Sequence, residues 1–159
     1  MLIDQIRNIM DRYGKFMVAS VQDKLIKDNT NATGSAVQSV SYQLTERGLE
    51  ILGNKYISAI DTGTSAYNDR PSPIALEQWV KAKGITSDNP KYKPKDIAFA
   101  ISKKIYERGT IQRFGYIGTG ILQFVIDKNL QPFADDLTEV MEQEISIIAK
   151  KVQEDVNKN

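Results

Sequence analysis

The 159-residue chain contains neither cysteine nor histidine. The lack of cysteine excludes disulfides and thiol nucleophiles, and the lack of histidine excludes a serine–histidine–aspartate triad. Together the two absences remove the usual protein ligands of zinc and of haem iron. A magnesium or calcium site built from oxygen ligands would need spaced acidic residues, and no run of the EF-hand type is present. The sequence therefore predicts no cofactor and no metal.

Long apolar runs and a charge excess of one sign are missing as well. No stretch approaches the roughly 18 apolar residues of a membrane-spanning helix. The opening "MLIDQIRNIM" lacks the basic and apolar regions of a secretory signal. We therefore expect no membrane partner and assembly in a cytoplasm. Lys and Arg number 21 against 20 Asp and Glu, which argues against a dedicated nucleic-acid binder.

Apolar residues make up 41% and charged residues 26% of the chain, as in ordinary globular proteins. The length is that of one domain, so residues 1–159 are expected to form a single domain. No internal repeat or linker divides it.

Both ends of the chain have the pattern of long amphipathic helices, with apolar residues recurring every three or four positions. The first stripe consists of Ile3, Ile6, Met10, Tyr13, Met17, Val21 and Leu25. The second runs from Pro132 to about Val156 and consists of Phe133, Leu137, Val140, Met141, Ile145, Ile148, Val152 and Val156. Gly14 interrupts the first helix and is a candidate bend, because glycine weakens a helix by about 1 kcal/mol relative to alanine.

The segment "SYQLTERGLEIL", residues 41–52, predicts a β-hairpin. Alternation places Tyr42 with Leu44 on one face of the first strand and Leu49 with Ile51 on one face of the second. Arg47-Gly48 is the expected tight turn. Residues 55–63 either extend this sheet or form a short helix. The expected fold class is α+β, with a small antiparallel hairpin-based sheet packed by amphipathic helices and long N- and C-terminal helices.

A short helix framed by Ser72-Pro73 and Gly84 contains the only tryptophan of the chain. Its apolar face consists of Leu76, Trp79 and Val80, which are the candidate core anchor. A tryptophan can also form a ligand platform or a subunit contact. A further helix is expected over "IAFAISKKIYERGT", closing at Gly109.

The apolar, glycine-rich stretch 111–131 includes "GYIGTGIL". It is no dinucleotide loop, because Gln123 stands where the third glycine belongs, and it lacks the GK[ST] ending of a P-loop. We expect a flexible or strand-forming segment that contacts a partner. Its candidate subunit-interface residues are Phe114, Tyr116, Ile117, Ile121, Leu122 and Phe124.

A lysine cluster surrounds Tyr92, and its members are Lys81, Lys83, Lys91, Lys93 and Lys95. These lysines are candidates to face DNA, since lysine neutralises phosphates without reading base sequence. The alternative is an ordinary solvated face. Asp135 and Asp136 are adjacent and would point about 100° apart on a helix, so they form no acid–base pair. The sequence thus predicts no enzyme.

Three segments in a fixed order resemble small virion proteins of tailed bacteriophages. The segments are "TGSAVQSVSYQLTERGLEILGNKYISAIDTG", "RPSPIALEQWVKAKGI" and "IAFAISKKIYERGT". The similar proteins are neck, head–tail connector or tail-completion proteins, and the resemblance spans about residues 31–110. That family often carries an arginine-rich loop where this chain has "GTSAYNDRPSP", of which only Arg70 and Pro71 match.

The resemblance implies a structural, non-enzymatic virion protein that forms a homo-oligomeric ring between portal and tail. Its partners would be further copies of itself, portal or connector and tail proteins, and packaged DNA that passes without specific contact. It would be located in the virion, and in the host cytoplasm during assembly. One alternative is a nucleic-acid-associated accessory protein that uses the Lys81–Lys95 cluster. Another is a hydrolase that uses carboxylates and Mg²⁺.

Overall fold

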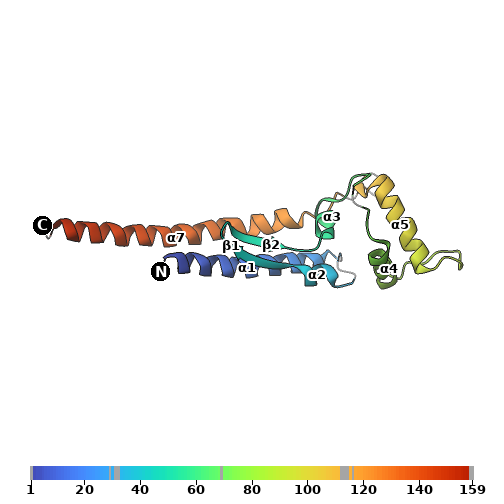
Figure 1. Cartoon of the computed structure of the whole chain (residues 1–159), viewed down its shortest axis with the longest axis horizontal. Coiled ribbons are helices and arrows are strands. Elements are labelled where there is room, and N and C mark those ends of the chain that lie inside the picture. Colours follow the sequence, from blue (N-terminus) through green and yellow to red (C-terminus); the bar gives the residue numbers. More distant parts are fainter. Residues whose placement is uncertain are drawn as a thin grey trace. The chain divides into compact units, whose positions relative to one another are not determined.

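A computed structural model describes residues 2–28, 30, 33–68, 70–111, 115 and 117–157. The chain has an α+β fold, in which helices accompany one two-stranded antiparallel sheet, and the expected fold class is confirmed (Figure 1). Its residues gather into two compact units. Unit 1 comprises Met1–Ser20, Ser41–Leu52 and Gln123–Asn159, and unit 2 comprises Val21–Val40 and Gly53–Leu122. The single domain expected for residues 1–159 stays a prediction.

Unit 1 is built on the greater part of two long helices, α1, Leu2–Lys27, and α7, Ile121–Asn157. The two helices run antiparallel and side by side in this unit (Figure 1). The Arg12 guanidinium and the Tyr13 hydroxyl both donate to the Asp136 carboxylate at 2.7 Å, and the Tyr13 ring centroid lies 5.1 Å from that of Phe133. Asp136 therefore links two helices.

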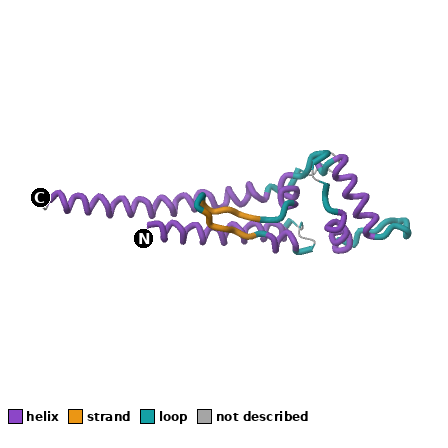
Figure 2. The backbone as a smooth tube through the Cα atoms, viewed as in Figure 1, coloured by secondary structure: helices purple, strands orange, loops and turns teal. Residues whose placement is uncertain are grey.

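The hairpin of unit 1 consists of β1, Ser41–Thr45, and β2, Gly48–Leu52, drawn in orange in Figure 2. Tyr42 pairs with Ile51 and Leu44 with Leu49, so these side chains share one face as expected. The two turn residues are Glu46 and Arg47, one position earlier than expected. Gly48 instead opens β2 with a φ of 131°.

Gly14 marks the place where the hairpin packs on α1. A Cβ atom at residue 14 would lie 2.4 Å from Cδ2 of Tyr42, so only glycine leaves room for this ring. The Tyr42 hydroxyl donates to the Asp11 carboxylate at 2.6 Å and holds the ring in place. Gly14 thus allows the Tyr42 ring of β1 to pack directly against the backbone of α1.

Unit 2 contains the shorter helices α2, Ser35–Ser39, α3, Tyr56–Thr62, α4, Pro73–Ala82, and α5, Pro94–Arg108. Residues 56–62 are therefore helical, which settles the ambiguous segment 55–63. Helix α4 begins at Pro73 and ends at Ala82, and the expected stop Gly84 follows two residues later with a φ of 63°. The Ile85 N–H donates to the Val80 carbonyl at 3.0 Å and closes the last turn.

The expected start of the C-terminal helix is Pro132. Helix α7 begins eleven positions earlier, at Ile121. Residues 121–131 of the expected glycine-rich segment are thus helical. The i, i+4 spacing of Ile121 and Val125, both buried, supplies the apolar face. Pro132 lies inside the helix and removes one backbone N–H from it, and the helix continues to Asn157. Among the described residues, no helix combines the length and apolarity that crossing a bilayer requires.

Candidate interaction surfaces

The proline-framed helix α4 is fixed in unit 2 mainly through Val80. Val80 is fully buried, as are Ala98 and Ser102 of α5, against which α4 packs. Leu76 and Trp79, the other two candidate anchor residues, are only partly buried. Of the three candidate anchor residues, the valine and not the tryptophan is thus the one that is fully buried.

The glycine-rich stretch before α7 is engaged by α3, which explains its composition. Gly118 has a φ of 89°, and a Cβ atom there would lie 1.9 Å from the Asp61 carbonyl oxygen. The Thr119 and Gly120 N–H groups donate to the Ile60 and Asp61 carbonyls at 3.0 and 3.1 Å.

The buried Asp61 side chain completes this contact. Its Oδ1 accepts from the Leu122 N–H at 2.9 Å, in the first turn of α7, where a carboxylate is favourable. Three N–H groups that a phosphate loop would offer to a ligand are thus occupied within unit 2. The "GTG" stretch, residues 118–120, thus connects the start of α7 to α3.

The six candidate interface residues have different surroundings. Ile121 is fully buried and is unavailable to another subunit, which corrects its assignment; the reason is that it forms the first turn of α7. Ile117, Leu122 and Phe124 are exposed. Phe114 and Tyr116 lie outside the described residues.

The five candidate DNA-facing lysines are all exposed. Lys81 and Lys83 lie at the end of α4, Lys91 and Lys93 in the following loop, and Lys95 in the first turn of α5. The Lys81 ammonium pairs with Glu77 at 2.7 Å. The five lysines thus belong to three different segments of unit 2 and not to one helix face.

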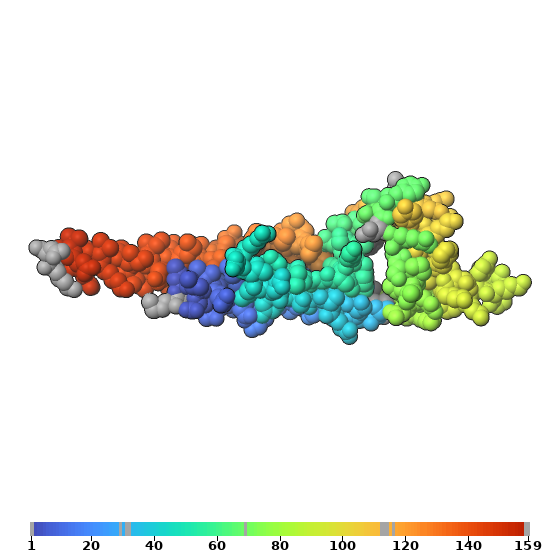
Figure 3. Space-filling view, in the orientation of Figure 1, coloured from blue at the N-terminus to red at the C-terminus, as the bar shows by residue number. Residues whose placement is uncertain are grey.

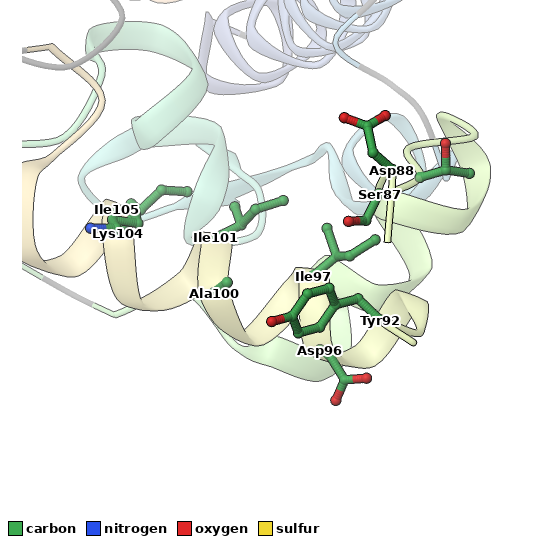
Figure 4. Close-up of a pocket in the computed structure, with 10 residues that line it drawn as sticks. Ser87, Asp88, Tyr92, Asp96, Ile97, Ala100, Ile101, Lys104 and Ile105 are labelled. Carbon is green, nitrogen blue, oxygen red and sulfur yellow. The ribbon is translucent and has the colours of Figure 1, made fainter. Parts of the chain in front are cut away.

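An open groove lies between this loop and α5 (Figure 4). It has a volume of about 670 Å³, and α5 supplies an apolar floor of Ile97, Ala100, Ile101 and Ile105. Ser87, Asp88 and the Tyr92 ring stand along its edge, with the ring beside Ile97 in Figure 4. Thr86, Asp96 and Lys104 complete the lining, so the groove combines an apolar floor with polar residues around it.

A second surface of unit 2, which we call the aromatic–cationic patch, was not recognised from the sequence. It consists of Tyr67, Arg70, Phe99, Lys103, Tyr106 and Arg108, which line a groove of about 660 Å³ with Glu107. The Tyr67 N–H donates to the Tyr106 carbonyl at 2.6 Å, and the two rings meet edge to face at 5.7 Å. The available signal was Arg70 followed by Pro71, together with the seven-residue spacing of Phe99 and Tyr106 on one helix face.

Arg70 is held in the patch by a short chain of hydrogen bonds. Its Nε–H donates to the Ser102 hydroxyl at 3.0 Å, and that hydroxyl donates to the Pro71 carbonyl at 2.7 Å. The guanidinium carbon lies 5.0 Å from the centroid of the Phe99 ring. Ser102 is fully buried, so Arg70 is anchored from below and its charged group lies over an aromatic face.

A third surface, the α7 stripe, lies in unit 1. It consists of Met141, Ile145, Ile148, Val152 and Val156, all more than half exposed. Since residues 12 and 13 contact residues 133 and 136, α1 reaches only to about residue 146 of the antiparallel α7. Figures 1 and 3 show the C-terminal end of α7 continuing beyond the start of α1. The C-terminal part of the stripe predicted from the sequence is thus exposed in the single chain, whereas its first members, Phe133, Leu137 and Val140, are partly buried.

Within the described part of the chain, no three acidic side chains gather in a way that could hold a metal ion. None of the family models, curated proteins or solved structures with which the chain was compared matches it.

Proposed function

We propose that the protein is a structural, non-enzymatic component of a tailed-phage virion. In this proposal it forms a homo-oligomeric ring in the neck or head–tail connector, joins portal to tail and surrounds the DNA channel. The resemblance of residues 31–110 to neck and tail-completion proteins supports this assignment. The ring would use heterologous contacts, in which one face of each subunit packs on a different face of the next.

The observation that carries the proposal is the exposed α7 stripe. Fully burying an isoleucine or valine side chain stabilises a structure by roughly 1.5–3 kcal/mol, and the stripe offers several such side chains to a partner. A subunit that leaves a long apolar helix face in water is suited to assembly. Ile117, Leu122 and Phe124 add exposed apolar surface near the start of the same helix.

Particle composition tests the proposal. Phage particles are purified, treated with nuclease, and analysed by quantitative peptide mass spectrometry against the major capsid protein, with the portal protein as the reference ring. A small, fixed copy number comparable to that of the portal protein is expected. Absence from particles combined with abundance in the infected cytoplasm would contradict the proposal.

The exposed lysines favour one second candidate, a nucleic-acid-associated accessory protein. Lys91, Lys93 and Lys95 are exposed around Tyr92, whose ring is exposed as well. Such a protein would bind duplex DNA with a steep loss of affinity as salt rises, because bound lysines release counterions. A filter-binding titration that stays flat at low salt removes this candidate.

A further inference from the structure

We propose that the aromatic–cationic patch of unit 2 binds single-stranded nucleic acid. Tyr67 and the stacked pair of Arg70 and Phe99 would receive unpaired bases, and Lys103 and Arg108 would contact the phosphates. This site is separate from the lysine cluster and does not depend on a role in the virion.

The exposure of the aromatic rings is the first observation. Tyr67 is 72% exposed and Phe99 54% exposed, although both belong to one groove in which further aromatic surface is supplied by Tyr106. Aromatic faces in water are what single-strand binders offer to bases, since every base can stack on them. The Tyr67 and Tyr106 rings lie 5.7 Å apart and Phe99 lines the same groove, so that bases of one strand can reach all three rings.

The backbone of Tyr67 is the second observation. Its φ of 58° lies in the left-handed region, which is unfavourable for a residue with a large side chain. The N–H bond to the Tyr106 carbonyl and the edge-to-face ring contact maintain this conformation. Because the ring remains in water, burial does not compensate for the strain. Strained positions of this kind concentrate at ligand sites.

The fixed position of Arg70 is the third observation. The hydrogen bond to buried Ser102 and the contact with the Phe99 ring set the plane of its guanidinium. A guanidinium plane is itself a surface on which bases stack and a donor to phosphate. No carboxylate of the described residues lies within ion-pair distance of Arg70, whereas Lys103 has Glu107 at 3.7 Å. The patch is therefore positively charged overall.

The combination favours a single strand over other anionic partners. In duplex DNA the base faces are stacked inside, so a duplex would use the cations and leave the rings uncovered. An acidic peptide would do the same, since it offers carboxylates and few flat groups. Unpaired nucleotides supply both phosphates and base faces.

Binding is measured by fluorescence anisotropy of a labelled oligothymidylate of about ten nucleotides, with a hairpin duplex of equal phosphate number as the comparison. We expect the single strand to bind more tightly than the duplex. Tyr67→Ala and Phe99→Ala should each weaken binding roughly tenfold, the usual effect of removing one stacking ring. Tyr56→Ala is the matched control, because Tyr56 is also an exposed tyrosine of unit 2 but lies outside both the patch and the lysine cluster, and it should leave the Kd within about twofold.

Several outcomes would overturn the proposal. These are equal affinity for duplex and single strand, equal loss in Tyr56→Ala and Tyr67→Ala, or competition by polyglutamate as effective as that by unlabelled oligothymidylate. Circular dichroism checks that each variant retains its helices. If Phe99→Ala does not, Phe99→Leu replaces it, since leucine keeps the apolar volume and removes the ring face.

Discussion

Gly118 is the residue at which an added methyl group meets the hardest obstacle. Its Cβ would lie 1.9 Å from the backbone oxygen of Asp61, and its φ of 89° disfavours any side chain. We expect Gly118→Ala to lower the free energy of unfolding by about 3 kcal/mol or more, because backbone must move. Urea unfolding measures this loss.

Gly120→Ala is the control for that substitution. Gly120 also has a positive φ, 62°, but a Cβ there meets nothing within 4 Å. Gly120→Ala should therefore lower the free energy of unfolding only by the conformational strain of about 1–2 kcal/mol. Equal losses in the two variants would show that α3 does not press against Gly118.

The Asp11 carboxylate of unit 1 makes the free energy of unfolding depend on pH in the acid range. Asp11 accepts hydrogen bonds from the Lys15 ammonium and the Tyr42 hydroxyl, both at 2.6 Å, and these lower its pKa below the ordinary 3.8, the lysine contributing most. The ionised form is thus favoured in the folded state. Its contribution is fully present above pH 3.8 and is lost as the pH falls through the lowered folded-state pKa.

Asp11→Asn should therefore be less stable than the wild-type chain at neutral pH, and the difference should shrink below pH 3.8. Urea unfolding of both proteins over a pH series measures the difference. A difference that stays constant through the acid range would mean that the Asp11 charge contributes nothing to folding.

Among the elements, α4 is held by one fully buried side chain. Val80→Ala removes two buried carbon atoms and leaves a cavity, so the free energy of unfolding should fall by about 2 kcal/mol. Ile74→Ala on the same helix is the control: Ile74 is 74% exposed, and its truncation should cost less than about 0.5 kcal/mol. Thermal or urea unfolding that ranks the two variants equally would contradict the burial of Val80 against α5.

Periodicity predicted most elements, and it failed where a stronger local signal opposed it. The alternation in residues 41–52 gave the hairpin face correctly, and the three- and four-residue spacing gave both long helices. The three glycines before residue 121, together with Pro132, predict an irregular segment for residues 121–131, which the structure shows as helix. Ile121 and Val125 already showed the helical spacing, but their burial depends on contacts that sequence does not reveal.

The candidate sites show the same limit. The lysine cluster could be named from sequence because exposed lysines need no tertiary partner. The aromatic–cationic patch could not, since Tyr67 meets Tyr106 and Arg70 meets Ser102 only after the chain has folded. The role of Gly14 was missed for the same reason, because the ring that fills its place belongs to Tyr42 in another element.

For the molecule as a whole, the question is what covers the α7 stripe. The stripe has a neighbour on the same helix, Ile147, which is 47% exposed but points about 100° away from Ile148. The two isoleucines have the same size and nearly the same exposure, so they differ mainly in the face they occupy. A partner that covers the stripe will bury Ile148 and leave Ile147 near the edge.

Ile148→Lys should therefore weaken self-association at least tenfold, since burying a lysine in place of isoleucine forfeits more than about 1.4 kcal/mol. Ile147→Lys should change it much less. Sedimentation equilibrium over a range of concentrations measures association, and circular dichroism confirms that both variants stay helical. If the wild-type chain is monomeric in solution, the same pair is compared by copy number in nuclease-treated particles. Equal behaviour of the two variants in whichever assay detects assembly would mean that the stripe is not the contact that joins subunits.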